Sequence, residues 1–173
     1  VVAAEVAHQL HLPLDVLIVR KIGHPLQREF AVGALAEGGV VLLDERVVGN
    51  NPVIRSELEA IIQEEKQRLH DYQARFHRAG SVNLEAKAVL LVDDGLATGA
   101  TTEAAVLSAR RQGARSVIVA APVASTNAVE RLSRLADQVV VLWVDPSFDA
   151  VGSYYELFSQ TTDEQVVDLL KAA

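Results

Sequence analysis

Residues 88–102, AVLLVDDGLATGATT, join a short run of branched apolar residues to an acidic pair and a loop of glycine and threonine. A compact apolar run that ends at once in loop residues is typical of a buried parallel strand. The Ala- and Arg-rich residues 101–112 predict a helix that ends at Gly113, because glycine adopts the left-handed conformation favoured there without a steric penalty. The stretch therefore predicts strand, loop and helix in direct succession.

The same alternation extends to both sides of this stretch. Apolar runs predict further buried parallel strands at residues 14–19, 116–121 and 138–144, and residues 126–136 have the apolar spacing of a helix. Parallel strands need crossover connections, which are usually helices. We therefore expect an α/β fold with a mostly parallel, twisted sheet flanked by helices. Trp143, inside an expected strand, is expected in the core.

The interval 38–87 departs from this pattern. Residues 39–43 predict a short strand, and Gly-Asn-Asn-Pro at 49–52 predicts a turn. Residues 53–78 are highly charged but carry an amphipathic stripe, so they predict either a packed or a solvated surface helix. We expect the interval to be an insertion in the α/β body. Near the end, Thr162 is expected to cap a final helix.

Length and composition restrict the class of protein. A chain of 173 residues with 50% hydrophobic content is expected to form a single domain over 1–173. Its net charge of -7 argues against a nucleic-acid or membrane partner, and its lack of cysteine excludes disulfides and thiolate sites. The apolar runs are shorter than the roughly 20 residues of a membrane span. We expect a small-molecule partner and a cytoplasmic location, with further residues before Val1.

The start of the helix after the acidic pair is a predicted phosphate site. The first N–H groups of a helix have no intrahelical acceptor, and together with the helix dipole they attract anions. Gly99 allows close approach of the backbone, and Thr98, Thr101 and Thr102 add hydroxyl donors. Neutral donors of this kind suit a phosphate monoester on a sugar.

The adjacent carboxylates Asp93 and Asp94 complete this predicted site. Because side chains alternate at a strand end, at least one of them faces the crevice where open α/β sheets bind ligands. Carboxylates accept hydrogen bonds from vicinal hydroxyls, so the stretch predicts a phosphorylated ribose site. The alternative is that the acidic pair caps a loop and Thr98-Gly99 only forms a turn. Walker and Rossmann loops are excluded by the spacing of the glycines and the absence of Gly-Lys-Ser/Thr.

Residues 89–101, VLLVDDGLATGAT, resemble the phosphoribosyl pyrophosphate signature of type I phosphoribosyltransferases. The resemblance implies transfer of a phosphoribosyl group to a nitrogenous acceptor, release of pyrophosphate, and magnesium carried with the substrate rather than by direct protein ligands. It implies that Asp93 and Asp94 bind the ribose hydroxyls. It places the 5-phosphate on Gly95, Ala97, Thr98, Gly99, Ala100, Thr101 and Thr102.

The resemblance also extends to a basic segment and to a flexible hood. Arg20 and Lys21, within VRKIG, resemble the residues that contact pyrophosphate, where fixed cations stabilise developing charge. Lys21 and Asp94 are the candidate catalytic residues, and a solvated basic strand end is the alternative for the segment. The interval 38–87 takes the place of the hood. Its basic residues that could reach pyrophosphate are Arg68, Arg75, His77 and Arg78.

The acceptor and the biological role stay open at this level. Ala97 stands where 6-oxopurine enzymes of this family carry an aspartate, which argues against hypoxanthine or guanine as the acceptor. Phe148, Tyr154 or Tyr155 could stack on a flat base, although such residues commonly pack a helix onto the core. The alternatives are a non-catalytic sensing module on the same fold and a receiver-like phosphoacceptor domain. The oligomeric state, a homo-oligomer included, is open.

Overall fold

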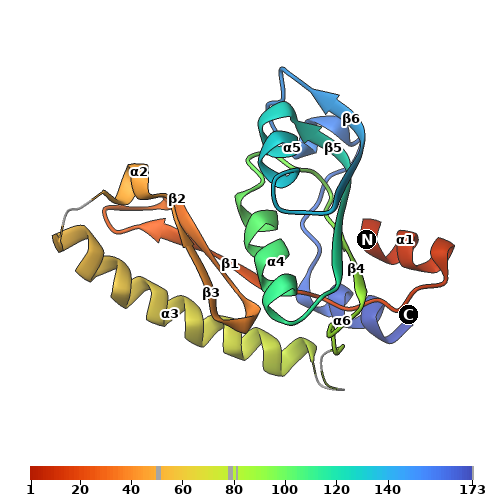
Figure 1. The fold of residues 1–173 in the computed structure, drawn as a ribbon, viewed down its shortest axis with the longest axis horizontal. Helices are drawn as coiled ribbons and strands as arrows, with labels where there is room; N and C mark the ends of the chain where they lie inside the picture. Colours follow the sequence, from red (N-terminus) through yellow and green to blue (C-terminus); the bar gives the residue numbers. More distant parts are fainter. Residues whose placement is uncertain (50–51, 78–79, 81, 173) are drawn as a thin grey trace.

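The computed structural model describes residues 1–49, 52–77, 80 and 82–172 and contains two three-stranded sheets (Figure 1). The parallel sheet has the order β4 (Ala88–Val92), β5 (Ser116–Ser125) and β6 (Gln138–Asp145). Helix α4 (Ala100–Arg111) leads from β4 to β5, and α5 (Thr126–Leu132) leads from β5 to β6. The predicted α/β fold is confirmed, because helical crossovers join parallel strands as the alternation required.

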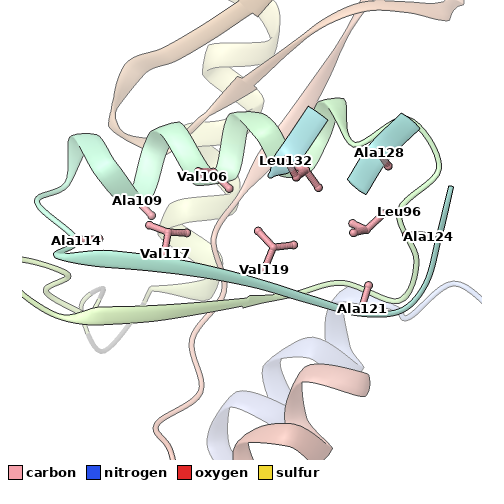
Figure 2. Close-up of a cluster of buried hydrophobic side chains, with 10 residues drawn as sticks. All are labelled: Leu96, Val106, Ala109, Ala114, Val117, Val119, Ala121, Ala124, Ala128 and Leu132. Carbon is pink, nitrogen blue, oxygen red and sulfur yellow. The ribbon is translucent and has the colours of Figure 1, made fainter. Parts of the chain in front are cut away.

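The core of this body lies between β5 and the two crossover helices. Val117 and Val119 of β5 are fully buried and pack in one cluster with Val106 of α4 and Leu132 of α5 (Figure 2). Helices α1 (Val2–Leu10) and α6 (Asp163–Ala172) lie on the opposite side of the sheet from α4 and α5 (Figures 1 and 2). The parallel sheet is thus a central layer, which explains the continuous apolar runs of its strands.

The second sheet is antiparallel, and its first strand begins later in the sequence than the strand that was predicted. It is formed by β1 (Val19–His24), β2 (Gln27–Ala36) and β3 (Val40–Leu43) in that order. The strand expected at 14–19 is wrong, since residues 12–18 have no regular secondary structure. At the end of this segment Glu37 binds both polar backbone groups of Ile18: its Oε1 accepts from the N–H of Ile18 at 2.8 Å, and its N–H donates to the carbonyl of Ile18 at 3.2 Å. An apolar run alone cannot distinguish a strand from a buried extended segment.

The long helix α3 (Pro52–Phe76) covers one side of the antiparallel sheet (Figure 1). Leu58, Ile61 and Leu69 of its apolar stripe are buried in a cluster with Ile22 and Leu35 of the sheet. The packed alternative for this helix is therefore correct. The connections around β3 are the 3-10 helix η1 (Glu37–Gly39) and the short α2 (Glu45–Val48).

The C-terminal segment shows one confirmed expectation and one correction. The Oγ1 of Thr162 accepts from the N–H of Gln165 at 3.3 Å, while Oε1 of Gln165 accepts from the N–H of Thr162 at 2.8 Å. This reciprocal cap confirms the predicted start of α6. The expectation for Trp143 is wrong: its exposed fraction is 65%, and its neighbours Leu142 and Val144 on β6 are exposed as well. Over the described ranges, no helix is both long and apolar enough to cross a membrane.

Candidate functional site

The loop between β4 and α4 returns to the sheet before it enters the helix. The N–H of Leu96 donates to the carbonyl of Val123 at 2.9 Å, and the N–H of Ser125 donates to the carbonyl of Leu96 at 2.9 Å. The side chain of Leu96 is buried in the main core. These contacts fix the loop beyond the carboxyl ends of β4 and β5, which is where open α/β sheets bind ligands.

Gly99 makes the sharp turn into α4. Its φ of 72° lies in the left-handed region, and a Cβ there would approach the backbone and Cβ of Ala128 at 3.4 Å. Glycine is favoured because it adopts this conformation without the penalty that other residues incur. The carbonyl of Gly99 accepts the N–H of Glu103 at 2.8 Å, so α4 begins immediately.

The loop and the first turn of α4 present free backbone donors. Among the described residues, none accepts a hydrogen bond from the N–H groups of Thr98, Gly99, Thr101 or Thr102. The Oγ1 of Thr98 lies at the same turn, 3.4 Å from the N–H of Ala100, and the Thr98 side chain is exposed. Unpaired N–H groups at a helix start form an anion-binding arrangement.

The two carboxylates of the loop have different environments. Asp93 is half-buried: its Oδ2 accepts from the Thr102 hydroxyl at 3.2 Å and its Oδ1 accepts from the N–H of Asp94 at 2.9 Å. Burial, followed by the neighbouring charge of Asp94, raises the pKa of Asp93 above its ordinary value. Asp94 is exposed. Asp94 therefore presents the more accessible carboxylate, and Asp93 braces the start of α4.

The structure brings the predicted loop residues together at one strand-to-helix junction. These residues are Asp93, Asp94, Gly95, Ala97, Thr98, Gly99, Ala100, Thr101 and Thr102. They are contiguous in sequence, so their proximity follows directly from the short loop. Their roles toward a ligand stay predictions.

The two basic residues of β1 lie on opposite faces of the antiparallel sheet, because successive side chains of a strand alternate. Arg20 pairs with Leu35 on the face that packs on α3, whereas Lys21 pairs with Ala34, which packs with Ala104 of α4. The Nε of Arg20 donates to Glu65 at 2.8 Å, and its guanidinium lies 5.4 Å from the centre of the Tyr72 ring. Lys21 is exposed and lines a cavity of about 580 Å³ between β1, β2 and α3, whose lining residues do not include the signature loop. The Lys21 ammonium has no side-chain partner among the described residues.

The other basic residues considered for pyrophosphate are held by carboxylates. Arg68 pairs with Glu65, and Arg75 pairs with Asp163 and Glu164 at the start of α6. The Nε2 of His77 lies 3.0 Å from the buried carboxylate of Glu37. Arg78 lies outside the described residues. In this conformation Arg68, Arg75 and His77 therefore have structural partners.

The aromatic residues near the C-terminus pack against one another. Phe148 stacks on Tyr154 with ring centres 5.2 Å apart, and the Tyr154 hydroxyl donates to Asp145 at 2.6 Å. This bond to a carboxylate raises the pKa of Tyr154 to about 12. Tyr155 lies against Phe158 with ring centres 5.3 Å apart, and its hydroxyl reaches the signature loop. Tyr155 therefore connects this aromatic group to the candidate site.

Three contacts of the loop have no signal in the local sequence. Ser125, Arg131 and Tyr155 each donate a side-chain hydrogen bond to a loop carbonyl. Ser125 ends the observed β5, four residues beyond the strand predicted at 116–121, so the sequence did not place it at this sheet edge. Nothing in the spacing of Arg131 indicates the contact.

Comparisons with known proteins agree with this arrangement of fold and loop. Residues 1–151 match the family described as the phosphoribosyl transferase domain. The chain belongs to this family, and the resemblance to type I phosphoribosyltransferases is confirmed.

Relatives of the chain occur in two bacteria. The proteins named "Putative phosphoribosyl transferase" MT0597 and Rv0571c, from the CDC 1551 / Oshkosh and H37Rv strains of Mycobacterium tuberculosis, are each 41% identical over 99% of this chain. The match spans 39% of each relative's length, so the chain corresponds to about two fifths of those proteins. The crystal structure of TT1426 from Thermus thermophilus superposes with a TM-score of 0.79 at 43% identity, covering 98% of this chain and 80% of that one.

Proposed function

We propose that the chain transfers the phosphoribosyl group of phosphoribosyl pyrophosphate to a nitrogenous acceptor and releases pyrophosphate. The observation that carries this proposal is the single loop that holds an exposed carboxylate, Asp94, next to the unpaired N–H groups of Thr98, Gly99, Thr101 and Thr102. Family membership supports the same chemistry. The negative net charge supports a small-molecule substrate rather than a nucleic acid.

The loop would act by positioning and electrostatics. Asp94 accepts hydrogen bonds from the ribose hydroxyls, assisted by Asp93, and the N–H groups and hydroxyls from Gly95 to Thr102 hold the 5-phosphate. The bond between ribose carbon 1 and the pyrophosphate oxygen breaks through an oxocarbenium-like state, and the acceptor nitrogen supplies the electron pair of the new bond. Fixing the sugar at both ends lowers the entropic part of this barrier.

Lys21 is our candidate cation for the departing pyrophosphate. Its ammonium has no side-chain partner in the described part of the chain, whereas Arg20 is already paired with Glu65. A free ammonium can be recruited without breaking an existing ion pair. Because Lys21 lies on the antiparallel sheet and not at the signature loop, we expect this contact to require movement of that sheet toward the loop.

Magnesium enters this proposal as part of the substrate. No cluster of three or more His, Cys, Asp and Glu side chains able to hold a metal occurs among the described residues. A magnesium ion can be held largely by phosphate oxygens and water, so it can enter with phosphoribosyl pyrophosphate without a direct protein ligand. When bound, the ion neutralises charge on pyrophosphate.

The residue Ala97 limits which nitrogenous acceptors the proposed reaction can use. An exposed methyl group at this loop position supplies no acid or base, so the acceptor nitrogen has to react without proton transfer from there. This argues for acceptors other than 6-oxopurines. Tyr155 is the aromatic residue beside the loop, through its bond to Asp94, and is our candidate neighbour of the acceptor.

Pyrophosphate release tests the proposal directly. The protein is incubated with phosphoribosyl pyrophosphate, magnesium and single acceptors from a panel of purines, pyrimidines and related amines, and pyrophosphate is measured by a coupled assay. We expect release with at least one acceptor and a loss of at least tenfold in Asp94→Asn. Tight binding of phosphoribosyl pyrophosphate without release for any acceptor would instead establish a non-catalytic sensing module on the same fold.

A further inference from the structure

Three side chains from outside the signature loop donate to its backbone carbonyls. The Ser125 hydroxyl donates to the carbonyl of Ala97 at 2.6 Å, and Nη1 of Arg131 donates to that of Thr98 at 3.1 Å. The Tyr155 hydroxyl donates to the carbonyl of Asp94 at 2.6 Å. The donors come from the end of β5, from α5 and from the segment after η2 (Val151–Tyr154). Three separate elements therefore hold one loop.

The direction of these bonds determines where the loop N–H groups point. In a planar trans peptide the C=O and the following N–H point to opposite sides. Holding the carbonyls of Ala97 and Thr98 toward Ser125 and Arg131 turns the N–H groups of Thr98 and Gly99 the other way. Neither of these N–H groups has an acceptor in the part of the chain that the structure describes. Successive N–H groups that point into one concavity, next to a left-handed residue, bind anions.

Arg131 has the most extensive role of the three. Its Nε also forms an ion pair of 3.0 Å with Glu103, in the first turn of α4. One guanidinium thus joins α5, the loop and the helix whose first N–H groups are free. These two contacts use two different N–H groups of the planar guanidinium. The single ammonium group of a lysine does not reproduce both of them.

Ser125 links the loop to the start of the neighbouring helix. Its Oγ accepts from the N–H of Ala128 at 3.0 Å and so caps α5 while it donates to Ala97. Ala128 is also the residue that a Cβ on Gly99 would approach at 3.4 Å. The first turn of α5 therefore both bonds to and packs against the loop.

We propose that Ser125, Arg131 and Tyr155 are positioning residues that hold the signature loop in its phosphate-binding conformation before any ligand arrives. The identity of the phosphate as the 5-phosphate of a ribose rests on the function proposed above. The conformational part of the inference does not, because it is argued from three hydrogen bonds within the chain itself.

Two measurements on the whole protein test this proposal. The first is the set of backbone ¹⁵N order parameters of Thr98 and Gly99 without ligand, and the second is the affinity for ribose 5-phosphate by calorimetry. The variants are Arg131→Gln, Arg131→Lys and Tyr155→Phe. The matched controls are Arg134→Gln, an exposed arginine two residues beyond α5, and Tyr154→Phe, which loses a hydroxyl bond to Asp145 instead.

We expect Arg131→Gln and Tyr155→Phe to lower the order parameters and to weaken ribose 5-phosphate binding, by about tenfold for Arg131→Gln. Arg131→Lys should restore only part of the loss, and both controls should match wild type. Unchanged order parameters, or an affinity loss equal in variants and controls, would overturn the proposal.

Failure of the proposed function gives a different result. A wild-type protein that binds ribose 5-phosphate but releases no pyrophosphate with any acceptor leaves the positioning role intact and removes catalysis. A wild-type protein that binds no ribose 5-phosphate overturns the ligand assignment, and the order parameters alone then decide whether the three residues hold the loop.

Discussion

The hydroxyl of Thr102, in the first turn of α4, donates a hydrogen bond of 3.2 Å to Oδ2 of Asp93, at the end of β4. The bond closes the signature loop on itself, since nine positions separate the two residues. It also holds a half-buried carboxylate beside a second one, that of Asp94. The loop therefore places two carboxylates side by side where a sugar is expected. Their mutual repulsion and the partial burial of one of them lower the stability of the folded state.

The first prediction concerns this loss of stability. Burial and the charge of Asp94 raise the pKa of Asp93 above its ordinary value of 3.8, so the folded state keeps the proton to higher pH than the unfolded state does. Stability is then greatest below the ordinary pKa and falls as pH rises through the folded-state pKa. An asparagine side chain at this position would have no proton to lose. We expect Asp93→Asn to be more stable than wild type at pH 7, with the difference vanishing on acidification.

Urea unfolding between about pH 3 and pH 7 measures this difference. A gain of about 1 kcal/mol at pH 7 would correspond to a rise in Tm of about 2–4 °C for a chain of this size. The control is Asp149→Asn, at an exposed carboxylate outside the loop. If Asp93→Asn is less stable than wild type at pH 7, the bonds that Asp93 accepts outweigh the cost of its burial.

A second prediction concerns the phosphate site. Thr98→Val removes a hydroxyl donor on the exposed side of the loop while keeping the shape of the side chain. We expect the Kd for ribose 5-phosphate to rise about tenfold, as for one lost hydrogen bond to a charged group, with the thermal stability unchanged. Thr126→Val, at the exposed start of α5, is the matched control. Equal affinity for Thr98→Val and wild type by calorimetry would refute the placement.

A third prediction concerns a partly buried histidine outside the loop, His77. The Nε2 of His77 lies 3.0 Å from Oε1 of the buried Glu37, and its Nδ1 lies 3.4 Å from Oδ1 of Asp15 without forming an aligned hydrogen bond. We expect His77→Ala to destabilise the fold by about 1–3 kcal/mol, because it removes a donor from a buried carboxylate.

Two further variants separate this effect from a general effect of mutation. His77→Gln keeps a donor toward Glu37 and should recover part of the loss. His70→Ala changes an exposed histidine on α3 and should have little effect. Urea midpoints at constant pH measure all three, and equal midpoints for the two alanine variants would show that the Glu37 contact contributes nothing.

A fourth prediction compares two leucines with opposite burial. Leu132, at the end of α5, is fully buried in the main core, whereas Leu142 on β6 has an exposed fraction of 84%. Leu132→Ala should cost about 2–5 kcal/mol through lost burial and the cavity that remains. Leu142→Ala should change stability by less than about 0.5 kcal/mol. A large loss of stability in Leu142→Ala, measured by denaturant unfolding, would mean that its face of β6 is covered in solution.

The sequence by itself determined the element that carries the candidate site. The apolar run of β4, the loop that carries the acidic pair and the helix α4 after it were all predicted, and so was the left-handed Gly113, whose φ is 86°. These features depend on local causes: backbone conformation, hydrogen bonds within one helix, and the periodicity of apolar residues. The strands β5 and β6 and the capped start of α6 were predictable for the same reasons.

Only the tertiary structure decided which segments pair and which side chains meet. Residues 12–18 have the apolar pattern of a strand, yet Glu37 binds the N–H of Ile18 where a neighbouring strand was expected. Trp143 is apolar but exposed, as are Leu142 and Val144 beside it, because burial depends on whether another layer covers that part of the strand. The three donors that hold the loop are 28, 33 and 61 positions from the carbonyls they bind. Contacts across such distances depend on how the layers pack, because local propensity and periodicity carry no information about partners that far along the chain.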